Sequence, residues 1–156
     1  MSDAVTSPLQ RLEEMGLELP EVATPVAAYV PAVRSGNLVF TAGQLPMRSG
    51  ELITTGKVGS GVTPEEAYAC AQQCALNALA AVNAEVPLEQ VRRVVKLVVF
   101  VASDPEFIGQ PGVANGASEL VGEVFGDAGV HARSAVGVPV LPLDAPVEVE
   151  MIVEVG

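Results

Sequence analysis

The clearest structural signal in the chain is the segment TPEEAYACAQQCALNALAAV at residues 63–82. Its first four residues form a capping box with proline at the first helical position, which is typical of a helix N-terminus. Small and apolar residues then recur with helical spacing; they are Ala67, Cys70, Ala71, Cys74, Ala75, Ala78 and Val82. We expect a helix whose small-residue face lies close against a sheet.

The strand that this helix would cover follows directly, as VRRVVKLVVFV at residues 91–101. It is apolar enough on both faces to be a central strand. Upstream, residues 27–33 and 38–43 flank turn residues 34–37 and predict a β-hairpin. Downstream, residues 134–140 predict a strand, and residues 147–155 predict another in which valine or methionine alternates mainly with glutamate.

The remaining segments complete the predicted architecture. Residues 113–125 carry the apolar stripe of a second helix that Gly126 would end, and residues 7–16 predict a short N-terminal helix. Residues 47–62, rich in Gly, Ser and Thr, predict a loop. The order β-β-α-β-α-β-β predicts an α+β domain with two helices on one face of a mixed sheet. We place this single domain at residues 26–156, after an N-terminal extension at residues 1–25.

Composition excludes several classes of function. The net charge is −11, from 19 acidic and 8 basic side chains, which argues against a nucleic-acid partner. No apolar run approaches the ~20 residues of a membrane span, and the N-terminus lacks a signal-peptide pattern. These features predict a cytoplasmic protein without a membrane partner. The mean hydropathy of +0.41 is high for a soluble monomer, so we expect apolar surface to be buried between subunits.

Two sequence features that resemble functional motifs are better explained otherwise. Cys70 and Cys74 are four residues apart on the predicted helix, a geometry that disfavours a disulfide, and no histidine lies nearby to complete a metal site. We interpret them as small core residues. The segment 50–57 resembles a phosphate loop, but five residues separate its glycines where four are required, so we exclude a phosphate loop there.

Arg133 and Glu148 are the candidate functional pair. The guanidinium of Arg133 stands among small neighbours and could bind a carboxylate, although a surface ion pair would also explain it. Glu148 belongs to an alternating strand, where a solvated acidic face is the alternative. A hairpin of the last two strands around residues 141–142 would bring the two within reach. A turn centred on Asp144 would break that pairing and leave another route, such as a subunit boundary.

Three further residues are candidates with simpler alternatives. Tyr29 offers a phenol and Asn115 an amide that could contact a ligand, whereas core packing and helix capping are their default roles. His131 could titrate near Arg133, or it could be an exposed loop histidine.

Several segments together resemble the RidA, or YjgF, family of imine deaminases. They occur in family order over residues 26–155 and are GNLVFTAGQLP (36–46), VVKLVVFV (94–101), ARS (132–134), LP (141–142) and VEVE (147–150). The resemblance implies a chorismate-mutase-like fold and a homotrimer with active sites between subunits. It also implies hydrolysis of reactive 2-imino or enamine acids, such as 2-iminobutanoate and 2-iminopropanoate, to 2-keto acids and ammonia. No metal or organic cofactor is implied.

The resemblance also implies roles for single residues. Arg133 would bind the substrate carboxylate and Glu148 would orient or deprotonate the attacking water, while Tyr29 and Asn115 would line the cleft. The family motif T-S-G-Q places Ala42 and Gly43 at the substrate.

The chain departs from the family at two of these positions. Ala42 replaces a usual serine, and Ala135 replaces a frequent cysteine, although a main-chain role for residue 135 would survive. The loss of the serine hydroxyl motivates the alternative of a non-catalytic protein that binds a small carboxylated metabolite. Endoribonuclease activity, attached to parts of the family, is disfavoured by the net charge of −11.

Overall fold

The computed structural model describes residues 6–25 and 27–156. Residues 1–5, which belong to the predicted N-terminal extension, and Val26, at the predicted domain boundary, lie outside the described residues. None of the helices in the described part combines the length and apolar character that a bilayer span requires.

A five-stranded mixed sheet forms the centre of the fold, as predicted. Its order is β1 (Ala32–Ser35), β2 (Leu38–Thr41), β9 (Val147–Val155), β7 (Val91–Ala102) and β8 (Ala132–Val138). The β1–β2 hairpin is antiparallel, as predicted, but its first strand begins only at Ala32 and includes Arg34 and Ser35, which were predicted as turn residues; the turn is residues 36–37. β7 lies between β9 and β8, in agreement with its apolar sequence.

The last two strands do not form a hairpin, and the other predicted alternative, a turn at Asp144 that breaks their pairing, is the one found. β8 runs parallel to β7, whereas β9 pairs antiparallel with β7 on its other side and with β2. The connection contains a short 3-10 turn, Pro142–Asp144, in which Leu143 and Asp144 both have positive φ. This turn carries the chain past the end of β7, so the two strands that are consecutive in sequence are not neighbours in the sheet.

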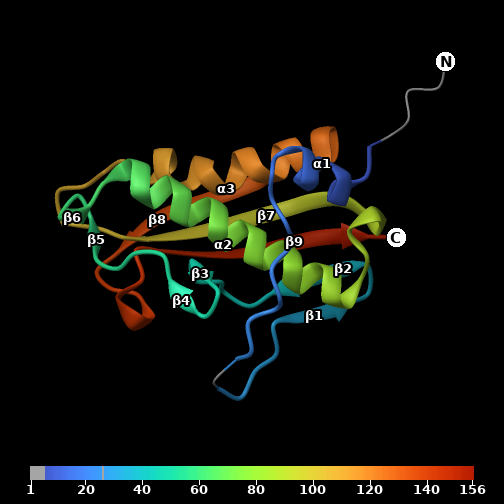
Figure 1. Ribbon diagram of the computed structural model, residues 1–156, viewed down its shortest axis with the longest axis horizontal. Helices are drawn as coiled ribbons and strands as arrows, with labels where there is room; N and C mark the ends of the chain where they lie inside the picture. Colours follow the sequence, from blue (N-terminus) through green and yellow to red (C-terminus); the bar gives the residue numbers. More distant parts are fainter. Residues whose placement is uncertain (1–5, 26) are drawn as a thin grey trace.

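Two helices cover one face of the sheet (Figure 1), as predicted. Helix α2 (Pro64–Glu85) begins where expected, because the Thr63 hydroxyl accepts a hydrogen bond from the backbone N–H of Glu66. Helix α3 (Gln110–Phe125) begins three residues earlier than predicted, with proline in its first turn. Proline fits there because the first N–H groups of a helix need no acceptor within it.

The core lies between these helices and the sheet. Its largest fully buried members include Leu79 on α2, Leu97 on β7 and Met151 on β9. Cys70 and Cys74 are free and buried, as predicted. Burial raises the pKa of the Cys70 thiol to about 11, with a further contribution from Glu66 and a small opposing effect of Arg48. Both cysteines therefore serve as small apolar side chains.

The N-terminal helix α1 (Pro8–Glu14) packs onto this core. This helix begins after Ser7, as predicted, and Ser7 and Gln10 form a reciprocal capping box that was not predicted. Leu12 is only 1% exposed and belongs to the main core, and the Arg11 side chain donates to the carbonyl of Val124 at the end of α3. The segment that follows α1 then crosses α2, as Figure 1 shows.

Residues 47–62 are more ordered than the predicted loop. They contain an antiparallel pair, β3 (Met47–Arg48) with β4 (Glu51–Leu52), and a parallel pair, β5 (Lys57–Val58) with β6 (Gly61–Val62). Strands of two residues are too short to leave a period-2 pattern, so composition alone indicated a loop.

Gly116 allows α2 and α3 to approach each other closely. A Cβ at this position would stand 2.1 Å from the carbonyl oxygen of Tyr68 and 3.2 Å from the Cβ of Ala71. Backbone atoms cannot move aside as a flexible side chain can, so even one added methyl group would force the helices apart.

We predict that G116A lowers the free energy of unfolding by about 2 to 3 kcal/mol through overpacking. The matched control is G122A on the same helix, where an added Cβ meets nothing within 4 Å. Its higher helix propensity should leave stability unchanged or raise it by up to ~1 kcal/mol. Urea unfolding followed by circular dichroism measures both, and equal effects of the two substitutions would contradict this packing account.

Candidate functional site

Arg133 lies on the edge strand β8 and points to the side of the sheet that the helices cover. Its register partner on β7 is the fully buried Leu97. One guanidinium nitrogen, Nη1, donates to Asn115 Oδ1 at 2.8 Å and to Ser118 Oγ at 3.0 Å, both on α3. Nη2 lies 3.4 Å from the carbonyl oxygen of Pro111. All three acceptors are neutral.

The charge of Arg133 is therefore not compensated by any side chain among the described residues. Within residues 6–25 and 27–156, no carboxylate lies within ion-pair distance of it; the ion pair found there joins Lys57 and Asp144. The alternative of a surface arginine paired with an acidic side chain does not hold for this part of the chain. A guanidinium held by neutral acceptors keeps its capacity to bind an anion.

Ser118 and His131 orient this guanidinium. His131 Nδ1 lies 2.6 Å from the carbonyl oxygen of Gly129, which can only accept, so the neutral ring carries its proton there. Nε2 must then accept from the Ser118 hydroxyl at 2.9 Å, and this leaves the lone pairs of Ser118 Oγ to accept from Arg133. His131 is thus half-buried in the Arg133 network, and not the exposed loop histidine that was its alternative.

Ser118 is not among the site residues predicted from the sequence. The sequence did contain an indication of its role, because Ser118 is three residues from Asn115 and shares one face of the predicted helix with it. Nothing in the sequence, however, indicates that this face of α3 meets the start of β8.

Glu148 lies on β9 and points to the opposite, uncovered face of the sheet. Its neighbours Val147 and Val149 are fully buried under the helices, and Glu148 itself pairs with Phe100 of β7. Partial burial raises the pKa of the Glu148 carboxyl above its ordinary value, and repulsion from Glu150 adds to the effect. A carboxylate whose pKa is raised toward neutrality is a better proton acceptor for catalysis.

Gly43 allows Glu148 to lie against the backbone. A Cβ on Gly43 would stand 2.8 Å from the carboxyl carbon of Glu148. Gly43 and Tyr29 also line a cavity of about 160 Å³. Ala42 precedes Gly43 and donates its backbone N–H to the carbonyl of Pro31 at 2.8 Å. The structure thus places Gly43 against Glu148 and, through the shared cavity, beside Tyr29, with the backbone of Ala42 fixed next to Gly43.

The two groups do not meet within one chain. Arg133 pairs with Leu97 and Glu148 with Phe100, so their α-carbons are separated by about 10 Å along the strands and about 10 Å across them. Leu97 and Phe100 are three positions apart on β7, an odd number, so the two side chains leave opposite faces of the sheet. Ala135 lies on the side of Arg133, packed against the main core. Convergence of Arg133 and Glu148 by a hairpin is excluded.

Comparison with known proteins identifies the family. The sequence pattern of the family described as "YjgF/chorismate mutase-like, putative endoribonuclease" matches residues 9–155. The chain belongs to this family. It is 46% identical to protein TCP17 of Trypanosoma cruzi over 99% of this chain and 96% of the relative. It is also 31% identical to a 2-iminobutanoate/2-iminopropanoate deaminase of Dermatophagoides farinae over 88% of this chain and 93% of that protein.

Solved structures agree with the fold of this YjgF-family chain. The crystal structure of protein Atu1372 from Agrobacterium tumefaciens superposes with a TM-score of 0.90 at 48% identity, covering 96% of this chain and 92% of that one. The predicted chorismate-mutase-like fold, with a mixed sheet and helices on one face, is thereby confirmed.

The raised pKa of Glu148 predicts a pH-dependent effect of E148Q on stability. Above the folded-state pKa the charged carboxylate disfavours the folded protein, whereas below the ordinary value of 4.5 it is protonated in both states. We therefore expect E148Q to be more stable than the parent protein near pH 8, with the gain disappearing near pH 4. Urea unfolding across this range measures the gain. The control E154Q, at the exposed end of the same strand, should show no such trend, and a gain for E148Q that grows toward low pH would refute the prediction.

Proposed function

We propose that this YjgF-family protein hydrolyses small 2-imino acids to 2-keto acids and ammonia. The observation that carries the proposal is the guanidinium of Arg133, which is oriented by Asn115 and Ser118 and has no acidic partner among the described residues. Its remaining N–H groups could bind the carboxylate that every 2-imino acid carries. The relative named as a 2-iminobutanoate/2-iminopropanoate deaminase supports the same class of substrate.

Glu148 would supply the base. A water molecule attacks C2 of the imine, Glu148 accepts a proton from it, and the C=N electron pair moves to nitrogen, which takes up a proton from solvent. The resulting carbinolamine collapses when its hydroxyl loses a proton to solvent, the C–N bond breaks and the nitrogen leaves as ammonia. Glu148 can return its proton to the departing nitrogen, so that one water is consumed and the base is regenerated. Its raised pKa favours both steps near neutral pH.

The cleft would form between subunits. Arg133 and Glu148 leave opposite faces of the sheet in one chain, so a small substrate could contact both only if they come from different chains. The uncovered face carries Val33, Phe40 and Val136, which are 53%, 40% and 44% exposed. Apolar surface of this kind favours burial against another copy. We propose a homotrimer, the assembly that the resemblance to the RidA family implies.

A second candidate is a non-catalytic carboxylate-binding protein of the same fold. Ala42 favours it, because this residue offers no hydroxyl beside Gly43 where the family pattern usually has serine. Such a protein would retain binding through Arg133 and lack turnover.

An imine-hydrolysis assay separates these functions. We expect keto-acid release from an imine generated by an amino-acid oxidase to be accelerated by the protein. R133A should lower kcat/KM about 100-fold or more through loss of the carboxylate contact, and E148Q should lower kcat by about 100- to 10,000-fold. The control is R34A, because Arg34 also donates to a neutral carbonyl but lies on β1. If the parent protein were no faster than R133A, deamination would be excluded, and retained keto-acid binding would then support the second candidate.

Subunit mixing tests whether the site is shared. R133A and E148Q should each be inactive alone, and co-refolding them in equal amounts should restore about a quarter of the parent activity. A shared site is intact only when the chain that supplies Arg133 is the E148Q variant and the chain that supplies Glu148 is the R133A variant, and each of these has a probability of about one half. Activity staying at the level of the single variants, in an assembly shown by light scattering to be mixed, would mean that both residues act from one chain.

A further inference from the structure

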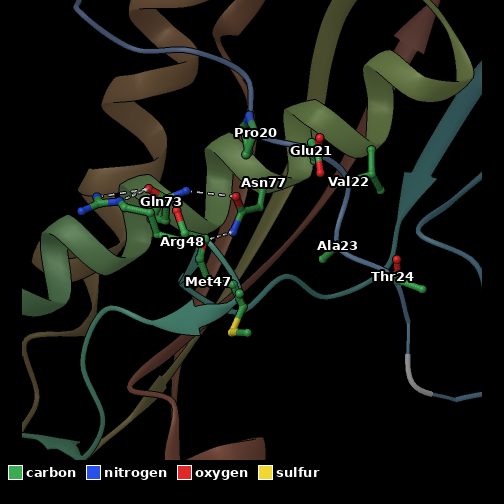
Figure 2. A pocket seen from close by; sticks show the side chains of 11 residues that line it. Pro20, Glu21, Val22, Ala23, Thr24, Met47, Arg48, Gln73 and Asn77 are labelled. Carbon is green, nitrogen blue, oxygen red and sulfur yellow. Dashed lines mark hydrogen bonds between the residues drawn. The ribbon is translucent and has the colours of Figure 1, made fainter.

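A second arginine, Arg48, lines a cavity of its own. None of the described residues that line this cavity is hydrogen-bonded to Arg133. The cavity measures about 560 Å³, within the roughly 300 to 1,000 Å³ of small-molecule sites. One wall is the segment that crosses α2, and the other is the β3–β4 hairpin. Figure 2 shows Pro20, Glu21 and Val22 on one side, with Arg48 and Gln73 near the helix surface.

A directional chain of hydrogen bonds leads to this guanidinium. Asn77 Nδ2 donates to the carbonyls of Leu45 and Met47 at 3.0 Å each, so its Oδ1 is available to accept from Gln73 Nε2, also at 3.0 Å. The Oε1 of Gln73 must then face Arg48, and it accepts from Nε and Nη2 at 3.2 Å each. Gln73 and Asn77 are each only 7% exposed, so the orientation of every amide is fixed by burial and by its partners.

This arrangement leaves Arg48 with unused binding capacity. Two of its five N–H groups are taken by Gln73, and within residues 6–25 and 27–156 the other three have no protein acceptor and no carboxylate within ion-pair distance. The hairpin does not need Arg48 as a tether, because Asn77 already binds two of its carbonyls. Although the chain has 19 acidic and only 8 basic side chains, the exposed guanidinium of Arg48 is held by the neutral amide of Gln73.

The surroundings define the chemistry of a ligand. Val22, Ala23 and Met47 supply apolar wall, and Thr24 and Ser49 supply hydroxyl groups. Glu21 lies in the same wall, while Glu13 and Glu18 line an adjoining cavity that shares Arg48 and Gln73. These carboxylates disfavour an anion of charge −2 or more, such as phosphate near neutral pH, and apolar walls disfavour a bare ion.

The geometry points to a binding site for a small monocarboxylate with an apolar body, whose carboxylate pairs with Arg48. The ligand's two oxygens would take the outward N–H groups of the guanidinium, and its hydrocarbon would lie against Val22 and Met47. Because Gln73 and Asn77 already hold the side chain in place, little conformational entropy is lost on binding. This site does not depend on the proposed imine hydrolysis at Arg133.

The test uses hexanoate as the probe, with the full-length protein. We expect hexanoate to shift the Arg48 Nε–H resonance in NMR spectra of the unmodified protein and to bind in calorimetry. R48Q should weaken binding about 10-fold or more, since a charge-assisted pair is lost. R34Q, a substitution of an arginine bound to a neutral carbonyl elsewhere, should change the affinity by less than about 2-fold.

Two comparison probes define the class of ligand. Methyl hexanoate, which lacks the charge, and inorganic phosphate, which lacks the apolar body, should each bind at least about 10-fold more weakly than hexanoate. The proposal is overturned if the Arg48 resonance does not respond to hexanoate, if phosphate binds as tightly, or if R133Q abolishes binding. The last result would assign the probe to the Arg133 site. The NMR titration of the unmodified protein decides the question even if R48Q fails to fold.

Discussion

Strand β7 pairs with a parallel strand on one side and an antiparallel strand on the other. This pairing determines where Arg133 and Glu148 lie. Parallel β8 is brought beside β7 by the crossover through α3, and antiparallel β9 occupies the other edge. Arg133 and Glu148 are thereby held on strands that do not touch, with side chains on opposite faces. The same sheet that fixes each residue rigidly prevents them from forming a site within one chain.

Different interactions hold Arg133 and Glu148, the two halves of the candidate site. On the covered face, α3 provides Asn115 and Ser118, and the tautomer of His131 sets the direction of the hydrogen bonds that reach Arg133. On the uncovered face, the missing side chain of Gly43 lets Glu148 lie half-buried, and that burial raises its pKa. A cation with free donors and a carboxylate with raised pKa are complementary parts of a hydrolytic site, provided that association of subunits brings them together.

Much of this architecture could be predicted from sequence because its signals are local. The cap at Thr63, the small-residue face of α2 and the alternation in β9 depend on residues near one another in the chain. The resemblance of ordered motifs also identified the family and the candidate residues. What could not be predicted is non-local: whether β8 pairs with β7 or β9, which face of α3 meets Arg133, and how closely Gly43 approaches Glu148. The relay from Asn77 to Arg48 was missed for the same reason, since it joins β3 to the middle of α2.

We propose that Arg133 and Glu148 of different chains share one small carboxylate. A crystal structure of the protein soaked with a 2-keto acid, the product of the proposed reaction, would show whether they do. The ligand carboxylate should contact Arg133 of one protomer while Glu148 of a neighbouring protomer lies beside C2. A ligand bound through both residues of a single protomer, or bound with Arg133 untouched, would contradict the proposal.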